Sequence, residues 1–229
     1  MPFFYMDQYY LLLVVPALIL SIIASARVKS TFRSYSKFEN SRGVTGAMAA
    51  KEVLAHYNLN DVSVERVSGE LTDHYDPRDN VIRLSESVYN STSIAAVGVA
   101  CHEAGHAAQH ANGYAPIKVR NAILPVTRIG SNLGIPLALI GLLLRFDMLI
   151  SIGLLLYALV AVFQFVTLPV EFNASRRAMN VIDQTAILSQ DETKGAKKVL
   201  SAAAMTYVAA LAVSIASILR LLLLVNRRR

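Results

Sequence analysis

The sequence predicts a mainly α integral membrane protein with a small α+β domain and about four transmembrane helices. Three observations support this fold class. The 229 residues are 54% hydrophobic and only 17% charged, a balance typical of a chain that places much of its surface in lipid. The apolar residues gather in four long runs of low charge, each about long enough to cross a bilayer as a helix. A polar stretch after the first run shows helix-like and strand-like patterns, which indicates a folded part outside the membrane.

Charge and cysteine content narrow the classes of partner. The net charge of +6 is modest and the basic residues flank apolar runs, so we expect them to set membrane topology and to contact the lipid bilayer. No nucleic-acid partner is expected. The single cysteine, Cys101, excludes an internal disulfide framework and is expected to be a small buried thiol on a helix. Whether the chain forms oligomers is not predicted from the sequence.

Residues 1–26 are predicted to form an N-terminal transmembrane anchor. The run 9–26 carries no charge, and the residues before it contain Asp7 but no Lys or Arg. Although residues 24–26 resemble a signal-peptidase site, a cleavable signal would need a positive segment before its apolar run, so a retained anchor is favoured. Basic residues follow the run and place the next segment in the cytoplasm and the N-terminus outside; they are Arg27, Lys29, Arg33, Lys37 and Arg42.

Residues 27–122 are predicted to form a cytosolic α/β part. Thr45 is suited to cap a helix that runs to about Tyr57. Residues 61–68 and 80–85 show strand patterns, separated by turns at 69–70 and 76–79. An exposed strand edge at 80–85 could bind an extended peptide by strand addition. An ordinary edge strand would show the same pattern, and both interpretations stand.

The most informative stretch is 91–112, which contains the motif His102-Glu103-Ala104-Gly105-His106. Histidines at i and i+4 lie on one helical face, so both imidazoles can reach one ion. Glu103 is placed to take a proton from a water on that ion. Ser91, Thr92 and Ser93 supply possible helix caps. The spacing predicts a zinc hydrolase site, with an incidental pair on a polar helix face as the alternative.

Residues 123–168 are predicted to form a transmembrane hairpin. The runs 129–144 and 148–168 hold no charge, and residues 145–147 make the turn between them. Gly130 and Gly134 form a small-xxx-small pair, which indicates close packing of helices.

The rest of the chain is predicted to comprise a cytosolic helical part at 169–202 and a C-terminal transmembrane or interfacial helix at 203–229. Pro169 suits the first turn of a new helix. The last apolar run contains Arg220 and ends in three arginines. A fourth crossing would leave this basic end outside, against the positive-inside tendency. The run therefore spans, lies in the interface or re-enters, and spanning is preferred.

Glu171 is the predicted third metal ligand. The two crossings of the hairpin return the chain to the leaflet where the two histidines lie, and Glu171 follows directly; its alternative role is a solvated interfacial carboxylate. Ser175, one turn on, could orient a histidine. His110 is the alternative ligand, although it lies about a turn from the ion. The metzincin pattern is rejected because Gln109 and Asn112 stand where it has Gly and His.

On these residues the chain resembles the bacterial YugP-type membrane zinc metallopeptidases, also called the neutral zinc metallopeptidase family, over nearly its whole length. It is more distantly similar to HtpX and CAAX prenyl protease-type gluzincins, whose second motif ends in Asp where this chain has Ser175. The resemblance implies a gluzincin-like zinc protease domain in a multi-pass protein of the bacterial cytoplasmic membrane, with the site facing the cytosol. The predicted Zn²⁺ ligands are His102, His106 and Glu171. Ser175 therefore replaces the carboxylate that usually lies beside a ligand in those families.

The predicted function is zinc-dependent endopeptidase activity in membrane-protein quality control. Zinc would lower the pKa of its water toward ~7, and Glu103 would pass the proton from that water to the leaving amine. His74, Tyr75 and Arg177 stay open as the group that stabilises the oxyanion. Peptide or membrane-protein substrates are expected to lie antiparallel to residues 80–85.

Two other functions compete with the peptidase. A non-enzymatic zinc-binding scaffold or pseudoprotease is the alternative, because such a protein would keep the metal ligands without hydrolysis. A transporter is not favoured, because the crossings lack the acidic and histidine side chains of a cation path.

Overall fold

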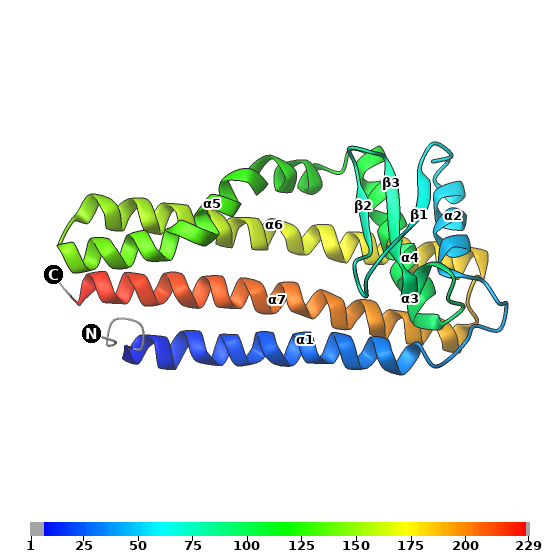
Figure 1. Cartoon of the computed structure of the whole chain (residues 1–229), viewed down its shortest axis with the longest axis horizontal. Coiled ribbons are helices and arrows are strands. Elements are labelled where there is room, and N and C mark those ends of the chain that lie inside the picture. The colour runs from blue at the N-terminus through cyan, green and yellow to red at the C-terminus, as the bar shows by residue number, and fades with distance from the viewer. Residues whose placement is uncertain (1–6, 228–229) are drawn as a thin grey trace. The chain divides into compact units, whose positions relative to one another are not determined.

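A computed structural model describes residues 7–227 (Figure 1). Among these residues, four helices are long and apolar enough to cross a membrane by length and composition: Tyr10–Tyr35, Ala115–Leu144 (α5), Asp147–Thr185 (α6) and Gln190–Asn226 (α7). The first joins a π-helical segment, η1 (Tyr10–Val14), to α1 (Val15–Tyr35). The predicted fold class, a mainly α membrane protein with a small α+β part, is confirmed. Residues 1–6 of the predicted anchor and Arg228 and Arg229 lie outside the described residues.

The internal contacts of the chain divide it into two units. The helical unit comprises Met1–Ser25, Lys118–Pro169 and Met205–Arg229, as far as these are described, and the mixed unit comprises Ala26–Ile117 and Val170–Ala204. Helices α1, α6 and α7 each contribute residues to both units.

In the helical unit, α5 and α6 pack closely through glycines. A Cβ atom built on Gly130 would overlap the carbonyl oxygen of Leu156, and one on Gly134 would lie 2.9 Å from Cβ of Tyr157. Only glycine permits this approach of two backbones, as in other membrane helix pairs. The close packing predicted from this pair of glycines is confirmed.

Arg220, a charge inside the last apolar run, is buried in the helical unit and paired with Asp7. Its Nε donates to Oδ2 of Asp7 at 2.8 Å, and its Nη2 lies 2.7 Å from the same oxygen. The guanidinium also lies 5.0 Å from the ring centroid of Tyr10. Oδ1 of Asp7 accepts a hydrogen bond from the Tyr10 amide at 2.9 Å. The pair offsets the charge of Arg220 and links the first apolar helix to the last.

The mixed unit contains α2 (Gly46–His56), β1 (Ser63–Val67), β2 (His74–Asp76), β3 (Val81–Ser85), α3 (Glu86–Tyr89) and α4 (Ile94–Ala111). The predicted cap of α2 is confirmed, because Oγ1 of Thr45 accepts from the amide of Met48 at 3.2 Å. Among the three possible caps of α4, Ser93 takes this role, accepting from the amide of Ala96 at 3.2 Å.

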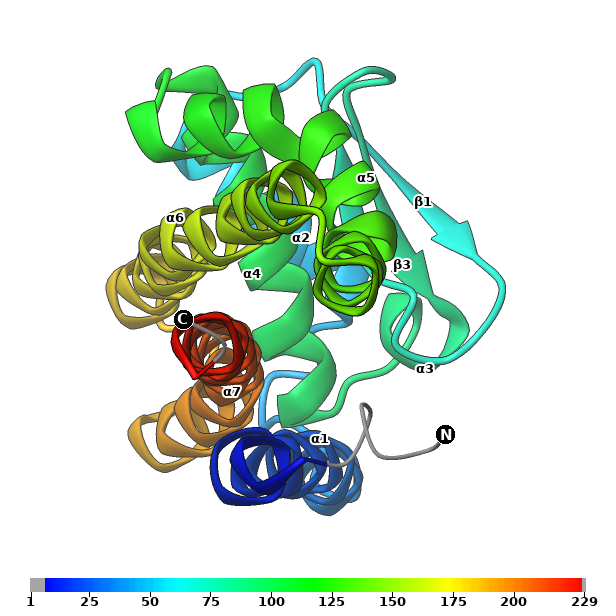
Figure 2. The ribbon, with the colours of Figure 1, turned by 90° about the vertical axis from the view of Figure 1, so that its left-hand side faces the viewer.

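The three strands form one sheet in the order β1-β3-β2, with β1 parallel and β2 antiparallel to β3. Figure 2 shows β1 and β3 side by side with α3 next to them. The prediction of an exposed edge at residues 80–85 is wrong, because β3 is the central strand and both its neighbours are occupied. The sequence pattern did not reveal β2, whose three residues are too few to show a period of two. The nearly continuous burial of β3 suits a central strand.

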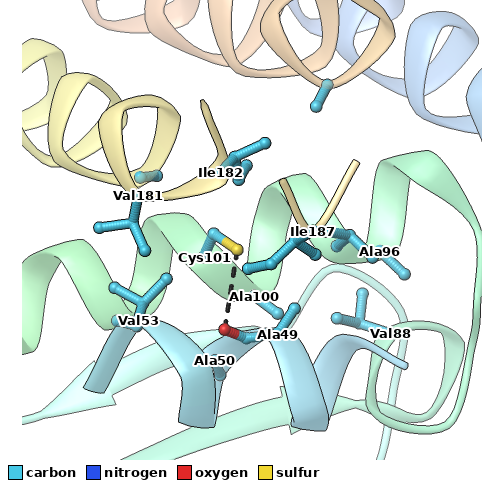
Figure 3. Close-up of a cluster of buried hydrophobic side chains, with 14 of the residues drawn as sticks. Ala49, Ala50, Val53, Val88, Ala96, Ala100, Cys101, Val181, Ile182 and Ile187 are labelled. Atoms are coloured by element: carbon cyan, nitrogen blue, oxygen red, sulfur yellow. Dashed lines mark hydrogen bonds between the residues drawn. The ribbon is translucent and has the colours of Figure 1, made fainter. Parts of the chain in front are cut away.

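A core of small apolar side chains joins α2 and α4 to β3 and to the parts of α6 and α7 in this unit. Figure 3 shows Cys101 at its centre, with Sγ directed at the carbonyl oxygen of Ala49, 3.9 Å away. Cys101 is fully buried, which confirms the predicted packing role. Burial raises the pKa of the Cys101 thiol well above its usual range, and the thiol form is a poor metal ligand.

Pro169 does not begin a new helix, contrary to the prediction, because it lies inside α6, which runs unbroken to Thr185. A proline inside a helix removes one backbone hydrogen bond. We attribute the continuation to the next turn, where Val170 and Ala174 are completely buried. Helix α7 begins at Gln190 and includes both the end of the predicted helical part at 169–202 and the last apolar run. Glu171 therefore lies in the middle of a long helix.

Candidate metal centre

Three side chains on two helices of the mixed unit converge on one point. His102 and His106 extend from α4, and Glu171 extends from α6. Oε2 of Glu171 lies 3.3 Å from Nε2 of His102 and 3.6 Å from Nε2 of His106. One possible ligand atom from each residue lies within 4.8 Å of the others, so the group could hold a metal ion. His110, the alternative third ligand, is not in this group.

The three side chains of the centre are mostly buried, and the two imidazole rings have a defined orientation. The side chain of Glu171 is 6% exposed and those of His102 and His106 are 14% and 12% exposed. The two imidazoles stand nearly perpendicular, with ring centroids 4.7 Å apart. The two imidazoles are therefore slightly exposed to solvent beside a buried carboxylate.

Each histidine is held at its outer nitrogen by a neutral side chain. Nδ1 of His102 lies 3.0 Å from Oγ of Ser175, and Nδ1 of His106 lies 3.0 Å from Oε1 of Gln109. The Nε2 atoms are thereby left for Glu171 and for a metal. The contact of Ser175 is the one predicted from its place one turn after Glu171. The role of Gln109 was not predicted from the sequence, although its position three residues after His106 puts it on the same helical face.

Gly105 lets the two ligand-bearing helices approach each other. A Cβ atom at this position would lie 2.6 Å from the carbonyl oxygen of Ala174. Gly105 precedes His106 on α4, and Ala174 follows Glu171 by nearly one turn on α6. The close backbone contact thus brings the carboxylate opposite the two imidazoles.

Glu103 lies beside the centre and contacts the sheet. Its Oε2 accepts a hydrogen bond from the backbone amide of Tyr75 in β2, at 3.1 Å. Burial is the main cause that raises the pKa of Glu103 to about 7; the charges of Glu171 and Asp73 add to the shift, while His102 and the Tyr75 amide oppose it. A carboxyl group with a pKa near neutrality can both accept and return a proton.

The three residues predicted as possible oxyanion partners each have a partner of their own. Nδ1 of His74 lies 2.7 Å from the carbonyl oxygen of Thr72, and the Tyr75 hydroxyl donates to Oδ1 of Asn80 at 2.9 Å. Nε of Arg177 donates to Oδ1 of Asn173 at 2.9 Å. The choice among these three side chains stays open.

The donor set fits zinc. Catalytic zinc uses two imidazole nitrogens and one carboxylate oxygen as ligands and keeps a fourth position for water or substrate. The neutral partners at both outer nitrogens supply the support that such imidazoles require. His102, His106 and Glu171 would hold the ion.

Taken together, four long apolar helices and this donor set define a membrane protein with a zinc-type metal centre. The chain belongs to the neutral zinc metallopeptidase family: the family model described as "Putative neutral zinc metallopeptidase" matches residues 10–226. A relative from Bacillus subtilis (strain 168), described as "Putative membrane protease YugP", is 47% identical over 215 residues, which cover 94% of this chain and 96% of the relative. No solved structure matched the chain.

Proposed function

We propose that this protein is a zinc-dependent endopeptidase of the bacterial cytoplasmic membrane, which cleaves membrane proteins or their juxtamembrane segments in quality control. The convergence of His102, His106 and Glu171, with Glu103 beside them, carries this proposal. The family and the description of the Bacillus subtilis relative as a membrane protease agree with it. The basic residues that follow the first apolar run favour a site on the cytosolic side.

The residues of the chain divide the work of peptide hydrolysis. A bound zinc ion would supply a Lewis acid that polarises the scissile carbonyl and acidifies a water. Glu103 would accept a proton from the attacking water at its carboxylate and deliver it to the leaving amide nitrogen. The hydrogen bond from the Tyr75 amide would hold the carboxyl group of Glu103 in place between these two transfers.

The substrate would pair with β2 rather than with residues 80–85. β2 is an edge strand, and the Tyr75 amide points toward Glu103 and not toward β3. Because the Tyr75 amide is occupied by Glu103, an added extended peptide would use the backbone carbonyls on that side of β2. A peptide bound there would run beside the group that we assign as the general base.

Metal content tests the ligand assignment. Elemental analysis of the detergent-purified protein should find about one zinc ion per chain, and His102→Ala and Glu171→Ala should each lose it. Zinc retained without Glu171 would reject that ligand and bring His110 or His74 forward. A wild-type protein without zinc would overturn the proposal.

The rate of casein hydrolysis distinguishes a peptidase from a non-enzymatic scaffold. Glu103→Gln should keep its zinc and lose about 10²–10⁴-fold in rate, the usual contribution of a general base. Glu86→Gln, at an exposed glutamate of the same unit, is the matched control and should retain the wild-type rate. Equal rates for Glu103→Gln and wild type would instead favour the zinc-binding scaffold.

A further inference from the structure

Gln109 is a polar side chain with no exposed surface at the back of the metal centre. It follows His106 by one turn on α4, and its Oε1 lies 3.0 Å from Nδ1 of His106. Its Nε2 donates to the backbone carbonyl of Val170 at 2.7 Å and to Oδ1 of Asn173 at 3.0 Å. One of these contacts is to a candidate ligand, and the other two are to residues within two positions of Glu171 on α6.

The orientation of this amide follows from its partners. Nε of Arg177 can only donate, so the Asn173 atom that it contacts must be oxygen. The Val170 carbonyl can only accept. The two hydrogens of the Gln109 amide therefore point at two acceptors, and its carbonyl oxygen faces His106. The flip ambiguity common to side-chain amides is removed by these contacts.

The tautomer of His106 follows from the same contacts. A carbonyl oxygen accepts and cannot donate, so Nδ1 of His106 must carry the hydrogen of this bond. In the neutral ring this leaves the lone pair on Nε2, the atom that faces Glu171. Gln109 thus prepares His106 to bind a metal without placing a charge in the core.

The same amide also fixes the position of the third ligand. Val170 immediately precedes Glu171 on α6 and is completely buried. Its carbonyl lies inside an α-helix, where it already faces the amide of residue 174. The bond from Gln109 is therefore additional, and it ties α4 to the helical turn that carries Glu171.

We propose that Gln109 is a positioning residue that sets the tautomer of His106 and the distance from His106 to Glu171. This inference rests on the proposed zinc site. It predicts that loss of the Gln109 amide weakens metal binding more than it weakens folding, because the buried contacts of the amide converge on the ligands.

The test compares Gln109→Met with a buried amide elsewhere in the mixed unit. Methionine keeps the length and volume of glutamine and removes the acceptor and both donors. Zinc affinity, measured by competition with a chromogenic chelator, should fall about 10–100-fold. The control is Asn40→Leu, because Asn40 is 5% exposed and its amide bridges Val44 and Thr92, neither of which is a candidate ligand. It should lower the unfolding temperature of the metal-free protein and leave the zinc affinity unchanged.

Gln109→Glu keeps the acceptor for His106 but loses both donors toward α6. It should unfold at a lower temperature than Gln109→Met and still bind zinc more tightly. Equal zinc affinities for Gln109→Met and wild type, or no advantage of glutamate over methionine, would overturn the inference. Because Glu171→Ala tests the site itself, loss of zinc there with retention in Gln109→Met would reject this inference and leave the proposed function standing.

Discussion

The two units of this protein use buried polar groups for different purposes. In the helical unit the buried guanidinium of Arg220 is paired with Asp7, and α5 and α6 meet through glycines. In the mixed unit a core of small apolar side chains surrounds a centre whose histidines are held by Ser175 and Gln109. Charge is paired with charge in the first unit, and ligands are held by neutral groups in the second.

We attribute this difference to the two solvents, which are lipid around the apolar helices and water around the mixed unit. Lipid offers little hydrophobic drive for helix association, so close packing and paired polar groups must hold the apolar helices together. In the mixed unit the burial of apolar side chains stabilises the fold, which leaves polar residues free to position ligands. We therefore expect polar substitutions in the helical unit to change stability, and those around the centre to change metal binding.

The largest expected loss of stability comes from breaking the buried pair. Asp7→Asn leaves the guanidinium of Arg220 without its carboxylate and should lower the free energy of unfolding by about 3 kcal/mol, measured by denaturation in detergent micelles. Zinc affinity should not change. The double variant Asp7→Leu with Arg220→Leu should recover most of the loss, because apolar residues often replace a buried pair without cost. A double variant as unstable as Asp7→Asn would show that the charge itself is not the cause.

Substitution of the glycines at helix contacts should reduce stability by a smaller amount. Its effect on zinc binding should differ between the two units. Gly105→Ala and Gly130→Ala each force a Cβ against a backbone carbonyl. Overpacking costs about 1–3 kcal/mol and alanine returns about 1 kcal/mol of helix propensity. Both should lower the unfolding temperature, and Gly105→Ala should also weaken zinc binding, because it pushes α6 away from the histidines.

A third glycine supplies the control for this pair. A Cβ on Gly98 would lie 3.3 Å from the side chain of Ala196, a contact that a small shift relieves. Gly98→Ala should therefore be the mildest of the three. Unchanged zinc affinity in Gly105→Ala would indicate that the approach of α4 to α6 does not set the geometry of the centre.

Much of the centre could be predicted from the sequence because its signals are local or follow from topology. The spacing of His102 and His106 places both on one helical face, and Ser93 is a helix cap by residue type. Glu171 follows from counting the crossings of the apolar hairpin. The structure brings the three candidate ligands, His102, His106 and Glu171, together.

The missed features depend on contacts between distant segments. Gln109 meets Val170 across 61 positions of the chain, and no local pattern encodes that contact. β2 is too short for a periodic signal, and without it β3 looked like an edge strand. Pro169 predicted a helix start on local grounds, and burial of the following turn overrode that preference.

The smallest expected effect comes from Ser175, whose contact with His102 can be compared with the contact of Gln109 with His106. Ser175→Ala removes the partner of His102, and zinc affinity should fall about tenfold, the low end for such contacts. The loss should be smaller than for Gln109→Met, because Ser175 is only half-buried, so water can replace its hydroxyl, and it does not tie two helices together. The unfolding temperature of the metal-free protein should change little.

Ser175→Asp restores an acceptor and adds a negative charge, as in the related motif that ends in Asp. Since a charged acceptor makes a stronger hydrogen bond, zinc affinity should recover to the wild-type value or exceed it in the same chelator competition. A loss as large in Ser175→Asp as in Ser175→Ala would mean that the centre excludes a second carboxylate. The neutral partners would then be a requirement of this site rather than a substitution that it tolerates.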